Sequence, residues 1–123
     1  MLFLSSDDII RIARSVIGPD VVIRDMGLIE AASARPQATV GGRYAYADVA
    51  SMAAALTHSL VTNHALVDGN KRLGLACLIV FLRMNGVRLT LSNDEAYDLI
   101  YGIASGDIRD VDDIARTLKA GSA

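Results

Sequence analysis

The residues from His64 to Arg72, in the order His-Ala-Leu-Val-Asp-Gly-Asn-Lys-Arg, hold the densest group of chemically useful side chains in the chain. Lys71 and Arg72 fall where we expect the first turn of a helix, whose N-terminus already carries partial positive charge. Two cations there oppose the helix dipole, at a cost of about 0.3–1 kcal/mol each. A bound anion reverses the sign of that effect, because free backbone N–H groups beside lysine and arginine form a phosphate site. The segment therefore predicts phosphate binding.

The other polar residues of this segment fit the same interpretation. Gly69 allows a tight turn and a close approach of the backbone to a ligand, and Asn70 can cap the helix or bind a phosphate oxygen. Asp68 lies beside the cations, which is explained if Mg²⁺ bridges its carboxylate and the phosphate. A neutral His64 facing the same cavity can accept a proton from an attacking hydroxyl group.

Each of these residues also has a simpler explanation when it is taken alone. Asp68–Asn70 is a common turn sequence, and Lys71-Arg72 is commonly a solvated helix face. His64 alone is more often a hydrogen-bonded histidine at a helix end than a base. The combination at this spacing, between two apolar helices, favours the functional interpretation. His58 lies on a different helix face, and we assign it a structural or surface role.

Length and composition place the chain among single-domain helical proteins. Its 123 residues fit one domain, residues 1–123. A composition with 52% hydrophobic but only 5% aromatic residues favours packed helices. A net charge of -2 (12 basic minus 14 acidic residues) argues against direct nucleic-acid binding. The apolar run Leu73–Leu82 is shorter than the ~20 residues of a membrane span. With no signal peptide visible, we expect a cytoplasmic protein without membrane contact. The single cysteine, Cys77, is expected to pack as a small hydrophobe.

Hydrophobic periodicity predicts about six helices, two of which hold the chemical segment between them. The first expected helix begins at Ser5 or Ser6 and ends at Gly18-Pro19, and the second covers Gly27–Ala34. The third runs from Asp48 to about Asn63 and the fourth from about Asn70 to Met84. The fifth follows a Ser92/Glu95 capping box and ends at Ser105-Gly106, and the sixth follows a cap at Asp110. Residues His64–Gly69 break the periodicity and form a loop. Residues Ala120–Ala123 are expected to fray.

The stretch Pro36–Tyr46 differs from the rest of the chain. It contains Gly41-Gly42 and two tyrosines and has no helical pattern, so it predicts a hairpin-like loop or flap. An ordinary surface connection is the alternative that the sequence leaves open. The preceding helix is expected to stop before Arg35-Pro36, because a residue before proline avoids the helical region.

The segment His64–Arg72 resembles the signature of the Fic/Doc family, histidine-x-phenylalanine-x-Asp/Asn-Gly/Ala-Asn-Lys/Gly-Arg. Its Asn70-Lys71-Arg72 ending is similar to the Doc (death-on-curing) branch. Leu28–Gln37, followed by Gly41-Gly42 and Tyr46, resembles the lead-in and flap of that branch. The Leu-Ser-x-Asp-Asp-Ile pattern near the start of the chain fits as well. The resemblance covers nearly the whole chain.

This resemblance implies an all-α Fic fold with a target-binding flap. It also implies a bacterial toxin of a toxin–antitoxin pair, with an antitoxin protein as a partner. The Doc branch phosphorylates translation elongation factor EF-Tu on a threonine, using ATP and Mg²⁺. The expected activity is therefore that of an ATP-dependent protein phosphotransferase, which transfers the γ-phosphate of ATP to a Ser/Thr hydroxyl.

The resemblance also implies a role for each motif residue. His64 would be the general base and Asp68 the Mg²⁺ ligand. The phosphate-binding anion hole would consist of Gly69, Asn70, Lys71 and Arg72. The flap, from Gln37 to Tyr46, would hold the protein substrate by strand addition.

Two positions depart from the family pattern. Leu66 stands where the signature has phenylalanine, and it should still anchor the loop in the core with less buried area. Relatives that transfer AMP have glycine where Lys71 stands and a second arginine where Leu75 stands, so both residues argue against AMP transfer. No internal inhibitory helix with the pattern of Fic autoinhibition is visible, which favours control by a separate antitoxin.

Two alternatives remain at this point. One is an AMP-transferring enzyme on the same fold. The other is a catalytically decayed interaction module that binds an antitoxin. The intact set of His64, Asp68, Asn70, Lys71 and Arg72 favours retained chemistry over the second alternative.

Overall fold

The helices begin at the capping residues that the sequence supplies. The computed structural model describes all residues from Met1 to Ala123 and contains α1 (Ser6–Val16), α2 (Met26–Ala34), α3 (Val49–Thr62), α4 (Asn70–Met84), α5 (Asn93–Ser105) and α6 (Val111–Ala120). Side chains of Ser5, Asp25, Asp48 and Ser92 accept hydrogen bonds from the first turns of α1, α2, α3 and α5. The prediction of an all-α fold with about six helices is confirmed.

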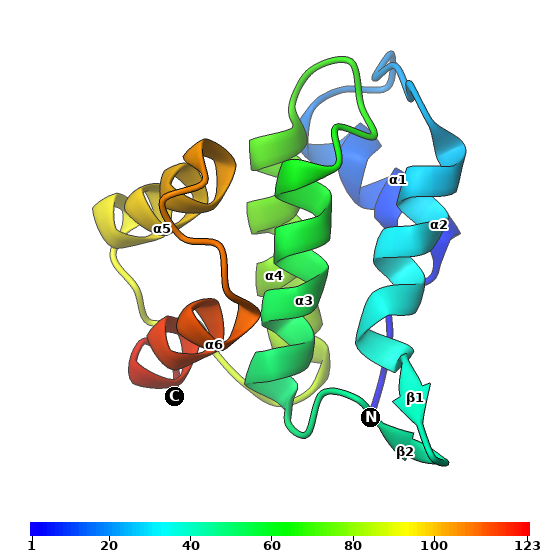
Figure 1. Ribbon diagram of the computed structural model, residues 1–123. Helices are drawn as coiled ribbons and strands as arrows, with labels where there is room; N and C mark the ends of the chain where they lie inside the picture. The colour runs from blue at the N-terminus through cyan, green and yellow to red at the C-terminus, as the bar shows by residue number, and fades with distance from the viewer.

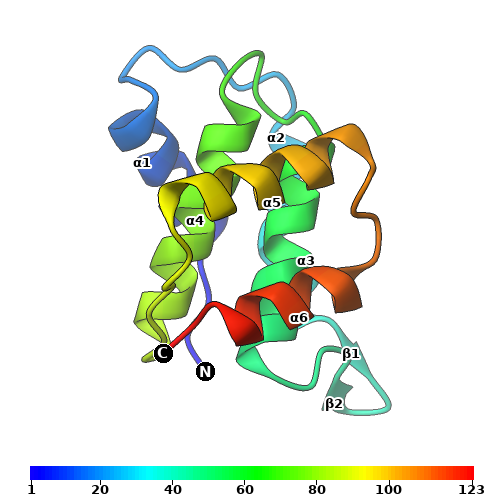
Figure 2. The same ribbon diagram turned by 90° about the vertical axis from the view of Figure 1, so that its left-hand side faces the viewer.

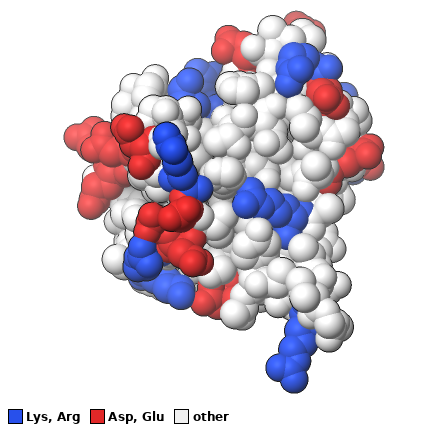
Figure 3. Space-filling model, in the orientation of Figure 1, with Lys and Arg blue, Asp and Glu red and all other residues white.

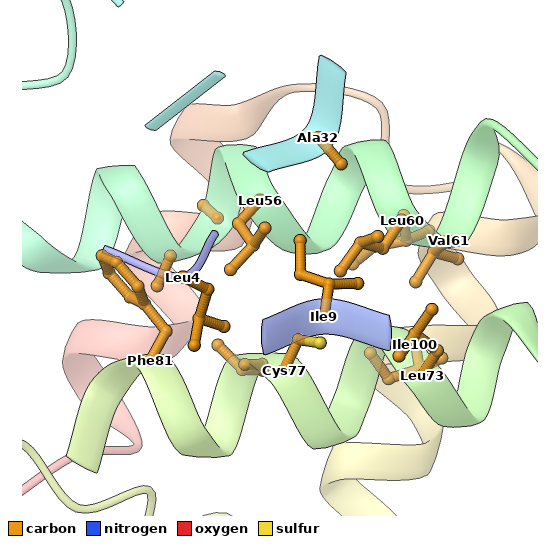
Figure 4. Close-up of a cluster of buried hydrophobic side chains, with 14 of the residues drawn as sticks. Leu4, Ile9, Ala32, Leu56, Leu60, Val61, Leu73, Cys77, Phe81 and Ile100 are labelled. Atoms are coloured by element: carbon orange, nitrogen blue, oxygen red, sulfur yellow. The ribbon is translucent and has the colours of Figure 1, made fainter. Parts of the chain in front are cut away.

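Helices α3 and α4 form the centre of the molecule. They lie side by side, with α1 and α2 on one side and α5 and α6 on the other (Figures 1 and 2). A cluster of 24 buried hydrophobic residues draws on all six helices, and Figure 4 shows part of it, including Ile9, Leu56, Phe81 and Ile100. The joined ends of α3 and α4 therefore present the loop between them on a rigid, fully packed support.

Close packing of α3 against α4 explains Gly74 in the apolar helix. A Cβ atom at Gly74 would lie 2.5 Å from Val61 Cγ2, so glycine lets the two backbones approach. Cys77 is fully buried in the same helix, as its position in the apolar run predicts. Burial raises the pKa of the Cys77 thiol to about 12.

The expected flap is a two-stranded hairpin. Strands β1 (Thr39–Val40) and β2 (Arg43–Tyr44) pair antiparallel, with Thr39 opposite Tyr44 and Val40 opposite Arg43. Gly41 and Gly42 form the turn with φ of +60° and +80°, which glycine adopts without strain. The hairpin projects at the end of the molecule opposite the loop between α3 and α4 (Figure 1).

The second helix ends at the predicted residue, but Arg35, the residue before proline, does not avoid the helical region as predicted. The α-helix does stop at Ala34, but a 3-10 turn, Arg35–Gln37, follows it, and Arg35 keeps a helical φ of -59° and ψ of -45°. Its side chain accounts for this: Nε donates to Tyr46 Oη at 3.1 Å, and Nη1 lies 2.9 Å from His58 Nδ1. Burial, and then the charge of Arg35, lower the pKa of His58. His58 therefore has the structural role expected from the sequence.

The end of the chain departs from expectation in two places. Ala120–Ala123 does not fray: Ala123 and Arg88 exchange two backbone hydrogen bonds of 2.9 and 2.8 Å, and Thr90 N donates to Gly121 O at 2.7 Å. The tail thus satisfies the backbone groups of the extended link before α5, which have no other strand to pair with. Asp110 does precede α6, but its side chain makes no capping hydrogen bond.

Acidic side chains gather on the side of the molecule that α5 and α6 form (Figure 3). Seven of the 14 acidic residues lie there, namely Asp94, Glu95, Asp98, Asp107, Asp110, Asp112 and Asp113. Several of them stand in helix first turns, where they complement the dipole. None of the helices combines the length and the apolar character needed to cross a membrane.

Candidate active site

The loop between α3 and α4 is held to the protein on both sides. Leu66 is only 1% exposed and belongs to the core, so it anchors the loop as expected for the family position that it occupies. The Asn70 side chain accepts from Leu66 N and donates to Leu66 O, both at 3.0 Å. Asn70 is thus the first residue of α4, and its amide closes the loop instead of capping the helix. A buried Leu66 backbone requires these partners.

The segment before α2 forms the other support of the loop. The N–H groups of Arg24 and Asp25 both donate to Ala65 O, at 2.8 and 3.1 Å, and Val67 N donates to Val22 O at 3.1 Å. The two segments run side by side at the same end of the molecule (Figure 1). The loop is therefore a paired, ordered structure.

The Arg24 side chain reinforces this pairing at the residue expected to act as the base. Its Nε donates to His64 O at 2.7 Å, and its Nη2 donates to Asn63 O at 3.3 Å. His64 itself adopts a φ of +54°, a left-handed conformation that non-glycine residues rarely take.

Helix α4 begins without a side-chain cap. Its N-cap is Gly69, at a φ of +93°, where a Cβ atom would come within 2.6 Å of Ile17 Cδ1. The first turn contains Lys71 and Arg72 and no acidic residue. Because first-turn N–H groups have no partner within a helix, they remain available to an anion. The start of α4 therefore has free N–H groups beside two cations, and phosphate binding there stays a prediction.

A cavity of about 480 Å³ opens beside this helix start. Residues 68–72 and Leu75 form one wall, and Asn93, Ala96, Tyr97, Ile100 and Tyr101 of α5 form the other. Its size is in the range of small-molecule sites. One end is cationic and polar, and the opposite wall is largely apolar and aromatic, which suits a ligand with a phosphate group and a flat ring.

The aromatic wall was missed by the sequence analysis. The rings of Tyr97 and Tyr101 stack with centroids 4.2 Å apart, and Lys71 Nζ lies 5.2 Å from the Tyr101 ring centre. Two of the four tyrosines stand four residues apart on one helix, where i and i+4 side chains meet. That spacing was the available signal.

The predicted site residues do not all share the cavity. Asp68, Gly69, Asn70, Lys71 and Arg72 all line it. The exposed His64 is not among the lining residues. Asp68 also borders a second cavity of about 370 Å³, formed with residues 17–22 and Val67. Asp68 therefore lies where the two cavities meet.

The acidic groups of the site limit how a metal ion can be held. Asp68 Oδ1 accepts from Gly69 N at 2.9 Å. No group of three or more His, Cys, Asp or Glu side chains is placed to hold an ion. The protein therefore supplies one carboxylate, which suits Mg²⁺ only when phosphate oxygens and water complete its shell.

Comparison with known proteins agrees with this geometry. The sequence profile of the Fic/DOC family matches residues 3–82. "Toxin Doc" of Mycolicibacterium smegmatis is 45% identical over 118 residues, covering 94% of this chain and 90% of the relative. "Protein kinase doc" of Escherichia phage P1 is 36% identical over 98 residues, covering 77% of this chain and 73% of the relative. On these matches, and on its helical fold with the motif loop at the start of α4, the chain belongs to the Fic/Doc family, within its Doc branch.

Proposed function

We propose that this protein is a toxin of a toxin–antitoxin pair that transfers the γ-phosphate of ATP to a serine or threonine hydroxyl of a protein target, with EF-Tu as the expected target. One observation carries the proposal: the uncapped start of α4, with Lys71 and Arg72, opens into a cavity of about 480 Å³ whose far wall is a tyrosine stack. The names of the two relatives, a toxin and a protein kinase, support it.

The nucleotide would bind between α4 and α5. Its phosphates would take the free N–H groups of the first turn together with the Lys71 and Arg72 side chains. The rings of Tyr97 and Tyr101 and the apolar Leu75 offer surfaces on which a base can pack. Leu75 also leaves no second arginine in this wall, which favours phosphate transfer over AMP transfer.

Asp68 is the residue that would hold Mg²⁺. Its Oδ2 is not used in any hydrogen bond within the protein, while Oδ1 is fixed by Gly69 N. The bound ion would neutralise charge on the phosphate oxygens during transfer. The carboxylate is fixed in place before any ligand arrives, because the turn at Gly69 orients it.

The proposed chemistry requires one base and one leaving group. His64 would remove the proton of the acceptor hydroxyl while the hydroxyl oxygen forms a bond to the γ-phosphorus. The bond from that phosphorus to the β,γ-bridging oxygen breaks, and ADP leaves. His64 is exposed and lies outside the nucleotide cavity, so a protein hydroxyl can reach it from solvent.

The hairpin is the proposed docking site of the target protein, which would extend along the molecule to bring its hydroxyl to His64 at the opposite end (Figure 1). Val40 and Tyr44 are 74% and 50% exposed, and the two short strands leave backbone groups free at their edges. Such an edge can pair with an extended segment of a partner. An antitoxin is the proposed second partner, and it would control the activity from outside the chain.

Labelled ATP tests the proposal directly. The purified protein is incubated with EF-Tu, or with bacterial lysate, Mg²⁺ and ATP labelled on either the γ- or the α-phosphorus. His64→Ala removes the proposed base, and His58→Gln is the matched control because the chain has only these two histidines. We expect γ-label on one protein with the wild type and with His58→Gln, and none with His64→Ala.

The other outcomes are equally informative. Label from the α-phosphorus would establish AMP transfer and overturn the proposed reaction. Absence of label from both, together with no Mg²⁺-dependent change in melting when ATP is added, would indicate a decayed interaction module. Label on a protein other than EF-Tu would keep the reaction and correct the target.

A further inference from the structure

His64 has a backbone conformation that a histidine does not favour. It is the sole non-glycine residue with a positive φ, at +54°. A side chain in the left-handed region crowds the backbone, so surrounding contacts must hold it there. Backbone angles set the direction of the Cα–Cβ bond, and the position of the imidazole depends on them.

Arg24 supplies contacts at this residue. Its guanidinium donates from Nε to His64 O at 2.7 Å and from Nη2 to Asn63 O at 3.3 Å. Its backbone N–H donates to Ala65 O at 2.8 Å. Arg24 thus binds the carbonyl groups of three successive residues, 63–65, although it lies 40 positions before His64 in the chain.

The location of Arg24 also fits the charges around it. Asn63 is the C-cap of α3, and the carbonyl groups at a helix C-terminus carry partial negative charge that favours a cation. Arg24 is exposed and belongs to neither the core nor the nucleotide cavity. Its side chain therefore has no role in packing the core or in lining the ATP site.

We propose that Arg24 is a positioning residue for His64: its guanidinium clamps the carbonyl groups of Asn63 and His64 and holds the imidazole in place for the acceptor hydroxyl. This inference rests on the proposed function for its catalytic consequence. Lysine would keep the charge but not the fork of two donors that reaches both carbonyl groups.

The test combines rates with a direct view of the His64 backbone. Transfer from γ-labelled ATP is measured for Arg24→Ala, Arg24→Lys and, as a matched control, Arg116→Ala, which removes an exposed arginine on α6. Backbone NMR shifts of His64 report its φ in the same variants without any need for activity. All rates are measured well below the melting temperature of each variant.

We expect Arg24→Ala to lower kcat about 10- to 100-fold, because a small displacement of a reacting group has effects of this size. The KM for ATP should stay within about twofold of wild type, since Arg24 lies outside the cavity. Arg24→Lys should be intermediate, Arg116→Ala should match wild type, and the His64 shifts should move away from left-handed values only in the Arg24 variants.

Three results would overturn the proposal: an unchanged kcat in Arg24→Ala, a loss that appears as a raised KM for ATP with kcat unchanged, or His64 shifts that do not move. If wild-type protein transfers no phosphate at all, the proposed function fails, and unmoved His64 shifts in Arg24→Ala then overturn the clamp separately.

Discussion

The N-terminal ends of α4 and α5 line the same cavity and are built in opposite ways. At α5, Ser92 Oγ accepts from Glu95 N at 3.1 Å, and Glu95 Oε1 accepts from Ser92 N at 2.9 Å. Asp94 and Glu95 add negative charge in its first turn. At α4, a glycine stands at the cap, no side chain accepts from the first turn, and both charged residues are cations.

We infer from this difference that the start of α5 serves folding and the start of α4 serves ligand binding. The start of α5 satisfies its own N–H groups and its own dipole, so it gains nothing from an added anion. The start of α4 leaves its N–H groups without acceptors and places cations against its dipole, which lowers the stability of the protein without a ligand. Departures from local folding rules are expected at functional sites, and this one lies beside a cavity, which supports the proposed binding site.

The largest expected effect comes from removing the cations of α4. The double variant Lys71→Ala, Arg72→Ala should lower phosphate transfer about 100- to 1,000-fold. In the absence of nucleotide, removal of Arg72 should raise stability by about 0.3–1 kcal/mol, while the lost contact of Lys71 with the Tyr101 ring offsets the gain at Lys71. Transfer assays and urea unfolding measure the two effects.

Lys119→Ala is the control for the stability effect, because it removes the other lysine of the chain from the C-terminal turn of α6. There the dipole has the opposite sign, and Lys119 Nζ also pairs with Asp48 Oδ2 at 3.0 Å, so stability should fall for both reasons. A double variant at α4 that is less stable and fully active would show that its cations serve folding.

The next effect concerns the carboxylate of Asp68, just before the start of α4. Asp68→Asn keeps an acceptor for Gly69 N but removes the charge expected to hold Mg²⁺. We expect half-maximal transfer to require at least about a tenfold higher Mg²⁺ concentration. A Mg²⁺ titration of the transfer rate measures it, with Asp107→Asn as a control at an exposed turn. An unchanged titration would remove Asp68 from the metal site.

A smaller effect is expected at α5. Ser92→Ala removes the capping acceptor and should cost about 1 kcal/mol in the free energy of unfolding. At a temperature where the variant is fully folded, its rate of transfer should remain close to that of the wild type, because Ser92 does not line the cavity. Urea unfolding and steady-state rates test both statements. Loss of transfer at full stability would show that the α5 start takes part in the reaction.

The smallest effect is a pH dependence that the start of α5 has and the start of α4 lacks. The backbone N–H of Ser92, and then its hydroxyl, hold the pKa of Glu95 below its ordinary value of 4.5. The ionised glutamate therefore stabilises the folded state above pH 4.5, and this contribution is lost as pH falls below that value towards the lowered pKa. Amide exchange should show the start of α5 fraying before the start of α4 in acid, because α4 has no such carboxylate to lose. Glu95→Gln should remove the difference, and identical behaviour of both helices would contradict it.

Local patterns were enough to predict most of the fold. Helical periodicity and caps such as Ser92 and Asp48 act within one or two turns of the chain, and the structure has them where they were expected. The hairpin followed from Gly41-Gly42 for the same reason.

What could not be predicted depends on contacts between distant residues. Arg24 lies 40 positions from His64, and the final residues pair with Arg88–Thr90, so no local spacing indicates either contact. The position of Tyr97 and Tyr101 opposite Lys71 depends on how α5 packs against α4. The motif loop itself was identified, but the position of His64 outside the cavity between α4 and α5 is a property of the tertiary structure.

The burial of Cys77 has a practical consequence for measuring motion in this protein. Thiol reagents attack the thiolate, and with a pKa of about 12 this cysteine holds almost none of it at neutral pH and offers no access to a reagent. A cysteine introduced at Val40, which is 74% exposed on the hairpin, would be the single reactive thiol. One fluorophore attached there would report engagement of the hairpin by an antitoxin or a target, without any need to replace the natural cysteine in the core.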